Sequence, residues 1–395
     1  MEVRKIFFKF FSYVIGDLLY FLSKMFPKDK KIWVFGSWYG NTFSDNSKYL
    51  YLYVLKNHPD IKAYWITQNN KVFRALKELS LPVLKKNSLK GILTILRAKV
   101  WIMSTARKDI SSMLYTNKSL NVQLWHGVGI KKIGYSTTFG NMPPFFNLKK
   151  KLFPFVSNLY KYDIVISTSK LWQERYSKAF RIPKENIPIT GQPRCDIFYH
   201  KKPEKKDYIQ ILFTPTHRRQ GSGKISSLFP TKEQFIKINE FLKKHNAILK
   251  LKLHYYDMKY IPDIHLSNIE VIDFDPMYDI QEELLNTDIL LVDYSGIYFD
   301  FLLLDRPVVF TAFDLEDYQH TDQGFYEPYE NIAAGKIAKD WDEVLEGIEE
   351  AIKYPDKYKE KRKKVRDRYW DPSVQDGNAS KRVMNIIINH KKMRD

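Results

Sequence analysis

Short runs of β-branched and aromatic residues alternate with stretches of helical periodicity along nearly the whole 395-residue chain. Consecutive parallel strands need a crossover connection, usually a helix, so this alternation is typical of parallel sheets covered by helices on both faces. A chain of this length exceeds what one hydrophobic core ordinarily supports, which favours two domains. We therefore predict an α/β fold with two domains and a cleft between them.

The expected elements divide at the charged, Pro-containing segment "YHKKPEKKD", which is typical of a linker. Before it we expect strands at 32–36, 63–67, 100–104, 122–125 and 163–167, and helices at 44–56, 71–79 and 170–180. After it we expect strands at 209–213, 248–254, 269–272, 288–292 and 307–310, and helices at 232–244, 297–304 and 341–354. The predicted domains are 28–199 and 207–365, and the segment 366–395 contains a C-terminal helix that can return to the first domain.

The segment 1–27 is rich in aromatic and aliphatic residues, but Lys9, Asp17 and Lys24 interrupt it. A membrane span needs about 20 nearly uninterrupted apolar residues. A helix here would carry its lysines on one narrow stripe, which is typical of helices lying in a membrane interface. We predict an amphipathic helix at an anionic membrane surface; the alternative is a first helix packed on its own domain.

Lysine and arginine outnumber the acidic residues by 64 to 45, a net charge of +19. This excess predicts an anionic partner, namely a phosphate-rich substrate, an acidic membrane surface or a nucleic acid. No nucleic-acid-binding module is recognisable, so nucleic acid is not a predicted partner. The basic run 357–368 is either a solvated helix face or a second membrane-facing patch. The single cysteine, Cys195, excludes an internal disulfide and fits a reducing compartment.

Polar clusters stand where several strands are expected to end. In "DILLVDYSGIYFDF" a buried strand is followed by Ser295 and Gly296 and then by a helix. Backbone N–H groups at a helix N-terminus bind phosphate, so this turn predicts a phosphate site; an ordinary helix cap by Ser295 is the alternative. Further polar strand ends are "TPTHRR" with Thr216 and Arg218, "LKLH" with His254, and "ITGQPRCD" with Arg194.

The stretch "VQLWHGVGIKKIG" delivers His126 at the tip of a strand, followed by Gly127, Gly129 and two lysines, Lys131 and Lys132. In contrast, "QGSGK" lacks the first glycine of a P-loop, because Arg218 stands there. The acidic "DFD" at 273–275 ends a second-domain strand and gives little support for a metal site, and no Cys/His cluster has zinc spacing. We predict no metal site.

Together these motifs, with "FGSWYGNTFSDNSKYLYLYV", "DRP" and "DGNASKRV", resemble the CDP-glycerol glycerophosphotransferase family, the teichoic acid primases and polymerases of Gram-positive cell walls. The resemblance runs from about Trp33 to near the C-terminus and depends on the order and spacing of the motifs. It implies the GT-B architecture, two Rossmann-like domains with the active site in the cleft. By its size the chain resembles the primase type. The family commonly has a second serine where this chain has Gly296.

The resemblance implies transfer of glycerol phosphate from CDP-glycerol to a hydroxyl of an undecaprenyl-diphosphate-linked disaccharide, with release of CMP and no required cofactor. We predict His126 as the general base, because histidine is neutral near pH 7. His254 is the second predicted catalytic residue. With Arg218, Ser295 and Gly296 it would surround the diphosphate, while Gly127 lets the loop approach the substrate and Lys131 attracts phosphates.

The remaining predicted substrate contacts are Thr216, Arg194, Asp45 and Asn46, the last two being either acceptor contacts or helix caps. His217 varies in such proteins and receives no catalytic role. The predicted location is peripheral, at the cytoplasmic face of the cell membrane. Alternatives are a CDP-ribitol or capsule-polymer phosphotransferase and a GT-B sugar transferase. From another class, a basic non-enzymatic protein that binds membranes or nucleic acid fits the charge but leaves the polar strand ends unexplained.

Overall fold

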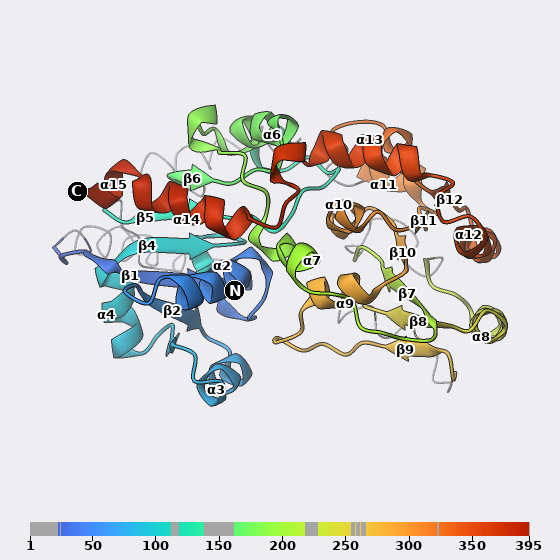
Figure 1. Ribbon diagram of the computed structural model, residues 1–395, viewed down its shortest axis with the longest axis horizontal. Coiled ribbons are helices and arrows are strands. Elements are labelled where there is room, and N and C mark those ends of the chain that lie inside the picture. The colour runs from blue at the N-terminus through green and yellow to red at the C-terminus, as the bar shows by residue number, and fades with distance from the viewer. Residues whose placement is uncertain are drawn as a thin grey trace, which may run out of the picture.

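The computed structural model of the protein describes residues 23, 25–111, 118–137, 162–217, 228–253, 257, 261, 266–321 and 324–394, with backbone alone at 320 and 321. Almost all of the predicted N-terminal helix, as well as Arg218 and His254, lies outside these residues. Within them the chain forms two six-stranded sheets in which every strand pair is parallel. Figure 1 shows the two sheets side by side along the long axis of the molecule.

The first sheet has the strand order β3-β2-β1-β4-β5-β6. Its strands are β1 (Asp29–Gly36), β2 (Lys62–Thr67), β3 (Val83–Lys85), β4 (Ala98–Met103), β5 (Leu120–Gln123) and β6 (Ile164–Val165). The helices of this half are α2 (Asp45–Asn57), α3 (Asn70–Glu78), α4 (Leu89–Arg97) and α6 (Lys170–Phe180). This is the Rossmann strand order, in which the chain reverses direction across the sheet between β1 and β4.

The second sheet repeats the order as β12-β11-β10-β7-β8-β9, with its reversal between β7 and β10. Its strands are β7 (Ile209–Thr214), β8 (Ala247–Leu251), β9 (Ile269–Val271), β10 (Ile289–Val292), β11 (Val308–Phe310) and β12 (Lys336–Ile337). Its helices are α8 (Lys232–Lys244), α9 (Ile280–Asn286), α10 (Ile297–Phe301), α11 (Leu315–Thr321) and α12 (Trp341–Lys353). The predicted α/β fold with two Rossmann-like sheets is therefore confirmed.

Each predicted strand appears within a few residues of its expected bounds, but two strands were not anticipated. These are the edge strands β3 and β12, three and two residues long. So short a run carries no hydrophobic period of its own, and only pairing with β2 or β11 makes it a strand. Both lie at sheet edges, where short strands are common.

The alternating side chains of β1 show how the core is built. Ile32 and Val34 pack on one face, in a cluster that continues into the second domain through Leu290 and Val292. Trp33 and Phe35 pack on the other face, against the buried side of α2 and against Val383, Met384 and Ile387. Residues i and i+2 of a strand share a face, so a strand buried on both sides is apolar throughout.

The last helices cross from one domain to the other (Figure 1). Helix α13 (Lys359–Tyr369) packs on the second domain, where Arg362 pairs with Asp305 at 3.1 Å. Helix α14 (Ala379–Asn389) lies beside the first sheet and packs on α2. The carboxylate of Asp196 accepts the N–H groups of Ala379 and Ser380, at 2.9 and 2.8 Å, and so caps α14. Two motifs that are 183 residues apart thus meet at one helix end.

Replacing Asp196 with alanine should lower the free energy of unfolding by about 1–2 kcal/mol, because two N–H groups at the start of α14 lose their acceptor. Urea unfolding would measure the change. The matched control is Asp196→Asn, which keeps an oxygen acceptor and should lose less. Equal losses in the two variants would show that the cap contributes little.

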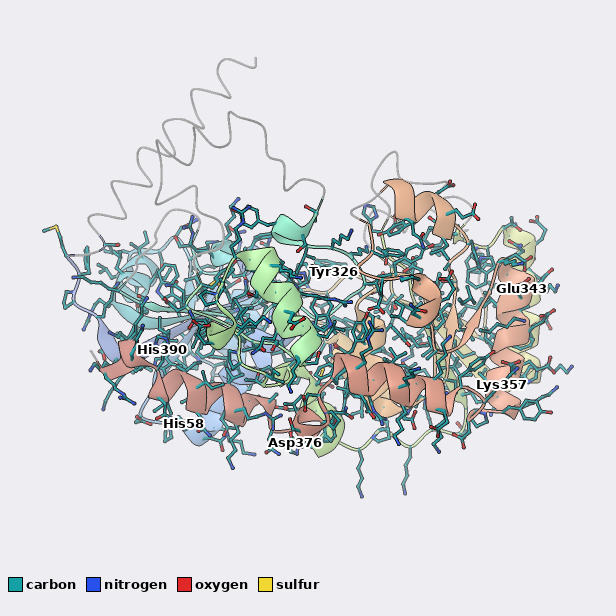
Figure 2. All side chains as sticks on the ribbon, turned by 90° about the horizontal axis from the view of Figure 1, so that it is seen from above. His58, Tyr326, Glu343, Lys357, Asp376 and His390 are labelled. Carbon is teal, nitrogen blue, oxygen red and sulfur yellow. The ribbon has the colours of Figure 1, made fainter. Side chains whose placement is uncertain are left out.

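Direct hydrogen bonds join the two domains. The N–H of Phe43 donates to the carbonyl of Pro276 at 2.9 Å, and Tyr49 donates to the carboxylate of Asp279 at 2.8 Å. On the other side of the cleft, the N–H of Tyr326 donates to the carbonyl of Ile130 at 2.8 Å. Figure 2 shows Tyr326 near the middle of the elongated molecule, between the two domains. These contacts hold the facing strand ends at a fixed separation.

Candidate active site

A cavity of about 620 Å³ lies between the domains, where loops from the carboxyl ends of both sheets meet. In open α/β sheets, ligands bind outside the carboxyl ends of the strands, at the point where the strand order reverses. Here the loops after β1 and β5 line one wall, and those after β7, β8 and β10 line the other. Eight of the eleven predicted site residues line this cavity: Asp45, His126, Gly127, Lys131, Arg194, Thr216, Ser295 and Gly296. Of the other three, Asn46 is buried behind the wall, and Arg218 and His254 lie outside the described residues.

His126 follows β5 on a sharply turned backbone. Trp125 has φ +56° and Gly127 has φ +114°, and the indole ring of Trp125 lies 4.3 Å from the imidazole, centroid to centroid. The Nδ1 atom of His126 lies 3.3 Å from the carbonyl oxygen of Ser104. A carbonyl only accepts, so this contact favours the tautomer in which Nδ1 carries the proton and Nε2 is free to accept one.

The surroundings of His126 lower its pKa below the ordinary histidine value. Removal from water by burial is the main cause, and the charge of Arg194 adds to it, while Asp45 and the Ser104 carbonyl oppose it. A lowered pKa keeps the imidazole neutral at pH 7. A neutral imidazole with Nε2 unprotonated is the form that a general base requires.

Arg194 is held by carboxylates from both domains. Its guanidinium lies 2.9 Å from Asp45 and 2.7 Å from Asp300, and all three side chains are buried. Burial disfavours the charge of Arg194, but Asp300 and Asp45 together raise its pKa above the ordinary value. Two carboxylates more than neutralise one guanidinium, so the trio offers no net positive charge to a phosphate. The geometry makes Arg194 a connector between the domains, and its contact with substrate stays a prediction.

Asn46 and Gly127 help to hold Arg194 in its place between the two domains. Asn46 accepts the backbone N–H of Arg194 at 3.0 Å and donates to the carbonyl of Trp125 at 2.9 Å. A Cβ atom at Gly127 would lie 2.3 Å from Nη2 of Arg194. The glycine is therefore required by the packing of Arg194, a reason that the sequence pattern did not reveal. Asn46 is not a helix cap, because Ser44 is the N-cap residue of α2. Its contact with the acceptor stays a prediction.

On the second-domain wall, Thr216 is tied to the strand next to it. Its N–H and its hydroxyl both donate to the carboxylate of Asp293, at 2.9 and 2.7 Å. Because the hydroxyl proton goes to Asp293, the side chain supports the loop, and phosphate contact by Thr216 stays a prediction. Beside it, His217 pairs with the buried Asp257 at 3.0 Å and also lines the cavity.

Ser295 and Gly296 form the turn between β10 and α10. Gly296 is the N-cap residue of α10, a helix that the structure describes in full, and no side chain forms a capping hydrogen bond with it. The structure therefore contradicts the alternative in which Ser295 is an ordinary helix cap. Ser295 lines the cavity, half-buried, on the wall opposite His126. The sequence motif thus places a small hydroxyl and a glycine at the carboxyl edge of a Rossmann-like sheet, the edge at which ligands bind in open α/β sheets.

Gly296 also makes the close approach of the two domains possible. A Cβ atom at this position would lie 2.5 Å from the carbonyl oxygen of Val128, which belongs to the first-domain loop. Any side chain at this position would therefore push the loop that contains Val128 away from the second domain.

Replacing Gly296 with alanine should lower the free energy of unfolding by about 1–3 kcal/mol, because Val128 and its loop must move away. Thermal unfolding would measure the loss. Gly129→Ala is the matched control, since a Cβ atom there would meet nothing nearer than 4.0 Å in the same interface. If both variants unfold at the wild-type temperature, the loops separate without cost.

Trp38 and Lys252 are among the cavity residues that received no role from the sequence. Lys252 stands two positions before His254 in the sequence "LKLKLH", so the period of two expected of a strand was a usable signal. Its Nζ donates to the carbonyl of Asp273 at 2.9 Å and lies 4.4 Å from the ring centre of Tyr278, and burial lowers its pKa. Lys131 supplies a second cationic side chain, with Nζ 5.0 Å from the ring centre of Tyr318.

Neither metal coordination nor membrane crossing is visible in the part of the chain that the structure describes. No three histidine, cysteine or acidic side chains are grouped there as metal ligands would be. Asp275, from the acidic "DFD" motif, instead pairs with Lys71 of the first domain at 3.0 Å. No helix in the described ranges combines the length and the apolar character of a membrane span.

The model of the family described as CDP-Glycerol:Poly(glycerophosphate) glycerophosphotransferase matches residues 18–389. The teichoic acid glycerol-phosphate transferase of Staphylococcus aureus (strain NCTC 8325 / PS 47) is 28% identical over 397 residues, which cover 95% of this chain and 98% of that protein. The teichoic acid ribitol-phosphate polymerase TarL of the same strain is 29% identical over 400 residues, which cover 96% of this chain and 64% of that protein.

The teichoic acid poly(glycerol phosphate) polymerase of Bacillus subtilis (strain 168) is 28% identical over 86% of this chain, which spans only 46% of that relative. Among solved structures, the wall teichoic acid polymerase TagF superimposes with a TM-score of 0.76 at 23% identity, over 99% of this chain and 96% of that one. The structural likeness supports the fold, and the predicted GT-B architecture agrees with it.

Proposed function

This chain belongs to the CDP-glycerol:poly(glycerophosphate) glycerophosphotransferase family, and we propose that it transfers glycerol phosphate from CDP-glycerol to a hydroxyl of a lipid-linked disaccharide. One observation carries the proposal. His126 of one domain and the Ser295–Gly296 turn of the other line a single cavity at the carboxyl ends of two Rossmann-like sheets. A neutral imidazole thus faces the proposed diphosphate turn across a cavity of about 620 Å³.

In the proposed reaction, Nε2 of His126 takes the proton of the acceptor hydroxyl. The acceptor oxygen forms a bond to the β-phosphorus of CDP-glycerol, and the bond from this phosphorus to the bridging oxygen breaks. CMP leaves with the electron pair of that bond. Catalysis of phosphoryl transfer depends mostly on positioning and electrostatics, so the cavity must neutralise the negative charge that develops on CMP.

The donor side of the cavity has groups suited to that task. We propose that the diphosphate lies at Ser295 and Gly296, with Lys252 and Lys131 as nearby cations and with the predicted Arg218 and His254 completing the set. No cofactor is part of the proposal. Adding a chelator should therefore leave CMP release unchanged, and loss of activity that Mg²⁺ restores would contradict this part.

CMP release tests the proposal directly. The protein would be incubated with CDP-glycerol and a disaccharide diphosphate on a short alkyl chain, and CMP would be quantified by chromatography. We expect release only when donor and acceptor are both present. The Ser295→Ala variant should release CMP more slowly. Absence of CMP with every acceptor tested, at protein concentrations that bind the donor, would contradict the assignment.

CDP-ribitol is the second candidate donor, because ribitol-phosphate and glycerol-phosphate enzymes resemble this chain almost equally, at 29% and 28% identity. The two donors share the cytidine diphosphate and differ in the length of the polyol. Competition between them in the CMP assay would separate the alternatives. Turnover with CDP-ribitol alone would replace the proposed donor without changing the proposed reaction type.

We further propose that the protein works at the cytoplasmic face of the membrane as a peripheral protein. The net charge of +19 supports this location, as do the exposed lysines of α13, including Lys361, Lys363 and Lys364. Vesicles containing phosphatidylglycerol should sediment the protein, and removal of the residues before Pro27 should release it. Sedimentation of the shortened protein at the original level would contradict a role of the N-terminal segment.

A further inference from the structure

Two large aromatic side chains are exposed in the loop that follows β1, and one of them, Trp38, lies beside His126. Trp38 and Tyr39 follow β1 at the carboxyl edge of the first sheet, and their exposed fractions are 41% and 46%. Trp38 lines the cavity, and its ring centre lies 5.5 Å from that of His126. An indole exposed to this extent leaves a large apolar area in contact with water, so a group that covers it is bound favourably.

The backbone that carries these rings is strained. Trp38 has φ +44° and Tyr39 has φ +61°, and Gly40 follows at φ +83°. Left-handed backbone costs free energy at every residue except glycine, and such strain gathers at functional sites. Two consecutive non-glycine residues in this region therefore require contacts that hold them there.

Those contacts come from a buried carboxylate. Asp109 accepts the N–H of Tyr39 at 2.8 Å and, through its other oxygen, the N–H groups of Ser104 and Thr105 at 3.0 and 2.7 Å. Lys86 donates to the carbonyl of Tyr39 at 3.2 Å. The loop after β4 thus fixes the loop after β1. The fold thus maintains a strained turn whose two aromatic side chains are both exposed, and of these Trp38 lines the cavity.

A polar edge adjoins the two rings. The N–H of Gln68 donates to the carbonyl of Gly40 at 2.9 Å, and its side-chain amide donates to Asn41 at 3.0 Å. Both amide side chains are exposed. A flat aromatic surface beside amide donors and acceptors matches a sugar ring, which has C–H groups on its faces and hydroxyl groups around its edge.

We propose that Trp38 and Tyr39 form an aromatic shelf that binds a sugar ring of the acceptor. This inference rests on the proposed function, because it uses the assignment of His126 as the base. The base must contact the acceptor hydroxyl, and Trp38 is the neighbour of His126 in the same domain, whereas the donor diphosphate is assigned to the opposite wall. The shelf binds the acceptor and takes no part in proton transfer.

Equilibrium binding tests the shelf without any turnover. A disaccharide diphosphate on a short alkyl chain would be titrated into the full-length protein in a calorimeter, with no donor present. Trp38→Ala should weaken binding about tenfold, the scale expected for losing one stacked aromatic ring. Trp38→Phe should retain most of the affinity. Alanine keeps the Cβ atom, so the backbone strain is the same and the thermal unfolding temperature should not change.

The matched control for Tyr39 is another exposed tyrosine, in a part of the molecule away from His126. Tyr354, 65% exposed, ends α12 and hydrogen-bonds to Lys357, which Figure 2 shows at the far end of the second domain. Tyr39→Ala should weaken binding of the disaccharide probe, and Tyr354→Ala should not. Equal affinities of wild type and Trp38→Ala would overturn the shelf, as would a wild-type protein that does not bind the probe.

Steady-state kinetics separate the shelf from other roles. Trp38→Ala should raise KM for the disaccharide acceptor about tenfold and leave KM for CDP-glycerol and the acid limb of the kcat profile unchanged. A raised KM for CDP-glycerol instead would mean that Trp38 contacts the donor, and a shifted acid limb would mean that it tunes His126; either result contradicts the shelf. Failure of the proposed function is distinct, since the wild type would then bind the disaccharide and release no CMP.

Discussion

Replacing His126 with alanine is expected to lower kcat by about 100-fold or more while leaving the affinity for CDP-glycerol nearly unchanged. The donor is assigned to the second-domain turn, so loss of an imidazole from the first-domain wall should affect proton transfer alone. CMP release under saturating substrates would measure kcat, and calorimetry with CDP-glycerol would measure donor affinity. A variant that keeps more than about a tenth of the wild-type kcat is incompatible with base catalysis by this residue.

His58→Ala is a suitable control, because this histidine follows α2 on the outside of the first domain (Figure 2) and does not line the cavity. The pH dependence gives a second readout. Burial lowers the pKa of His126. Activity should therefore fall only in more acidic solution than would protonate an ordinary histidine, whose pKa is about 6.5, as the imidazole gains a proton. The unfolded state binds this proton more readily, so the free energy of unfolding also decreases as the pH falls. The folded fraction must therefore be measured at each pH.

Replacing Arg194 with alanine is expected to lower the free energy of unfolding by about 3–5 kcal/mol. The change leaves Asp45 and Asp300 buried without the cation that both contact, at 2.9 and 2.7 Å. Urea unfolding followed by circular dichroism would measure the loss. Because the connection joins the domains, the variant should also lose turnover when it is folded.

The control restores charge balance. Adding Asp45→Asn and Asp300→Asn to Arg194→Ala removes both uncompensated carboxylates, and this triple variant should be more stable than Arg194→Ala alone. If Arg194 instead serves substrate, the single variant will unfold like the wild type and show a raised KM. That outcome would return Arg194 to the predicted substrate contacts and remove it from the framework.

Local sequence patterns were sufficient to predict the strands that carry the site. Strand β10 is a run of four buried aliphatic residues that ends directly before a polar turn, and β5 delivers His126 in the same way. Parallel strands bring their carboxyl ends to one edge, so polar residues after several strands can be expected to meet. For this reason eight predicted residues line one cavity. The two-residue strand β12 has no such pattern, and only its pairing with β11 makes it a strand.

The partners of these residues could not be predicted. Asp45 and Arg194 are separated by 149 residues, and nothing in either motif indicates a contact between them. The same holds for Gly127, whose missing side chain makes room for the guanidinium of Arg194. The exposed Trp38 also escaped notice, because an aromatic residue after a strand usually belongs to a core.

The amino-acid sequence alone determined the two parallel sheets and the chemistry available at their edges, because strand and helix periods are local properties of the chain. Only the tertiary structure decided which charges neutralise one another. Arg194 became a connector, and Gly296 became a point of contact, because packing brings distant segments within a few ångströms. Burial then altered the pKa of His126, since the energy of a charge depends on the water that surrounding residues exclude.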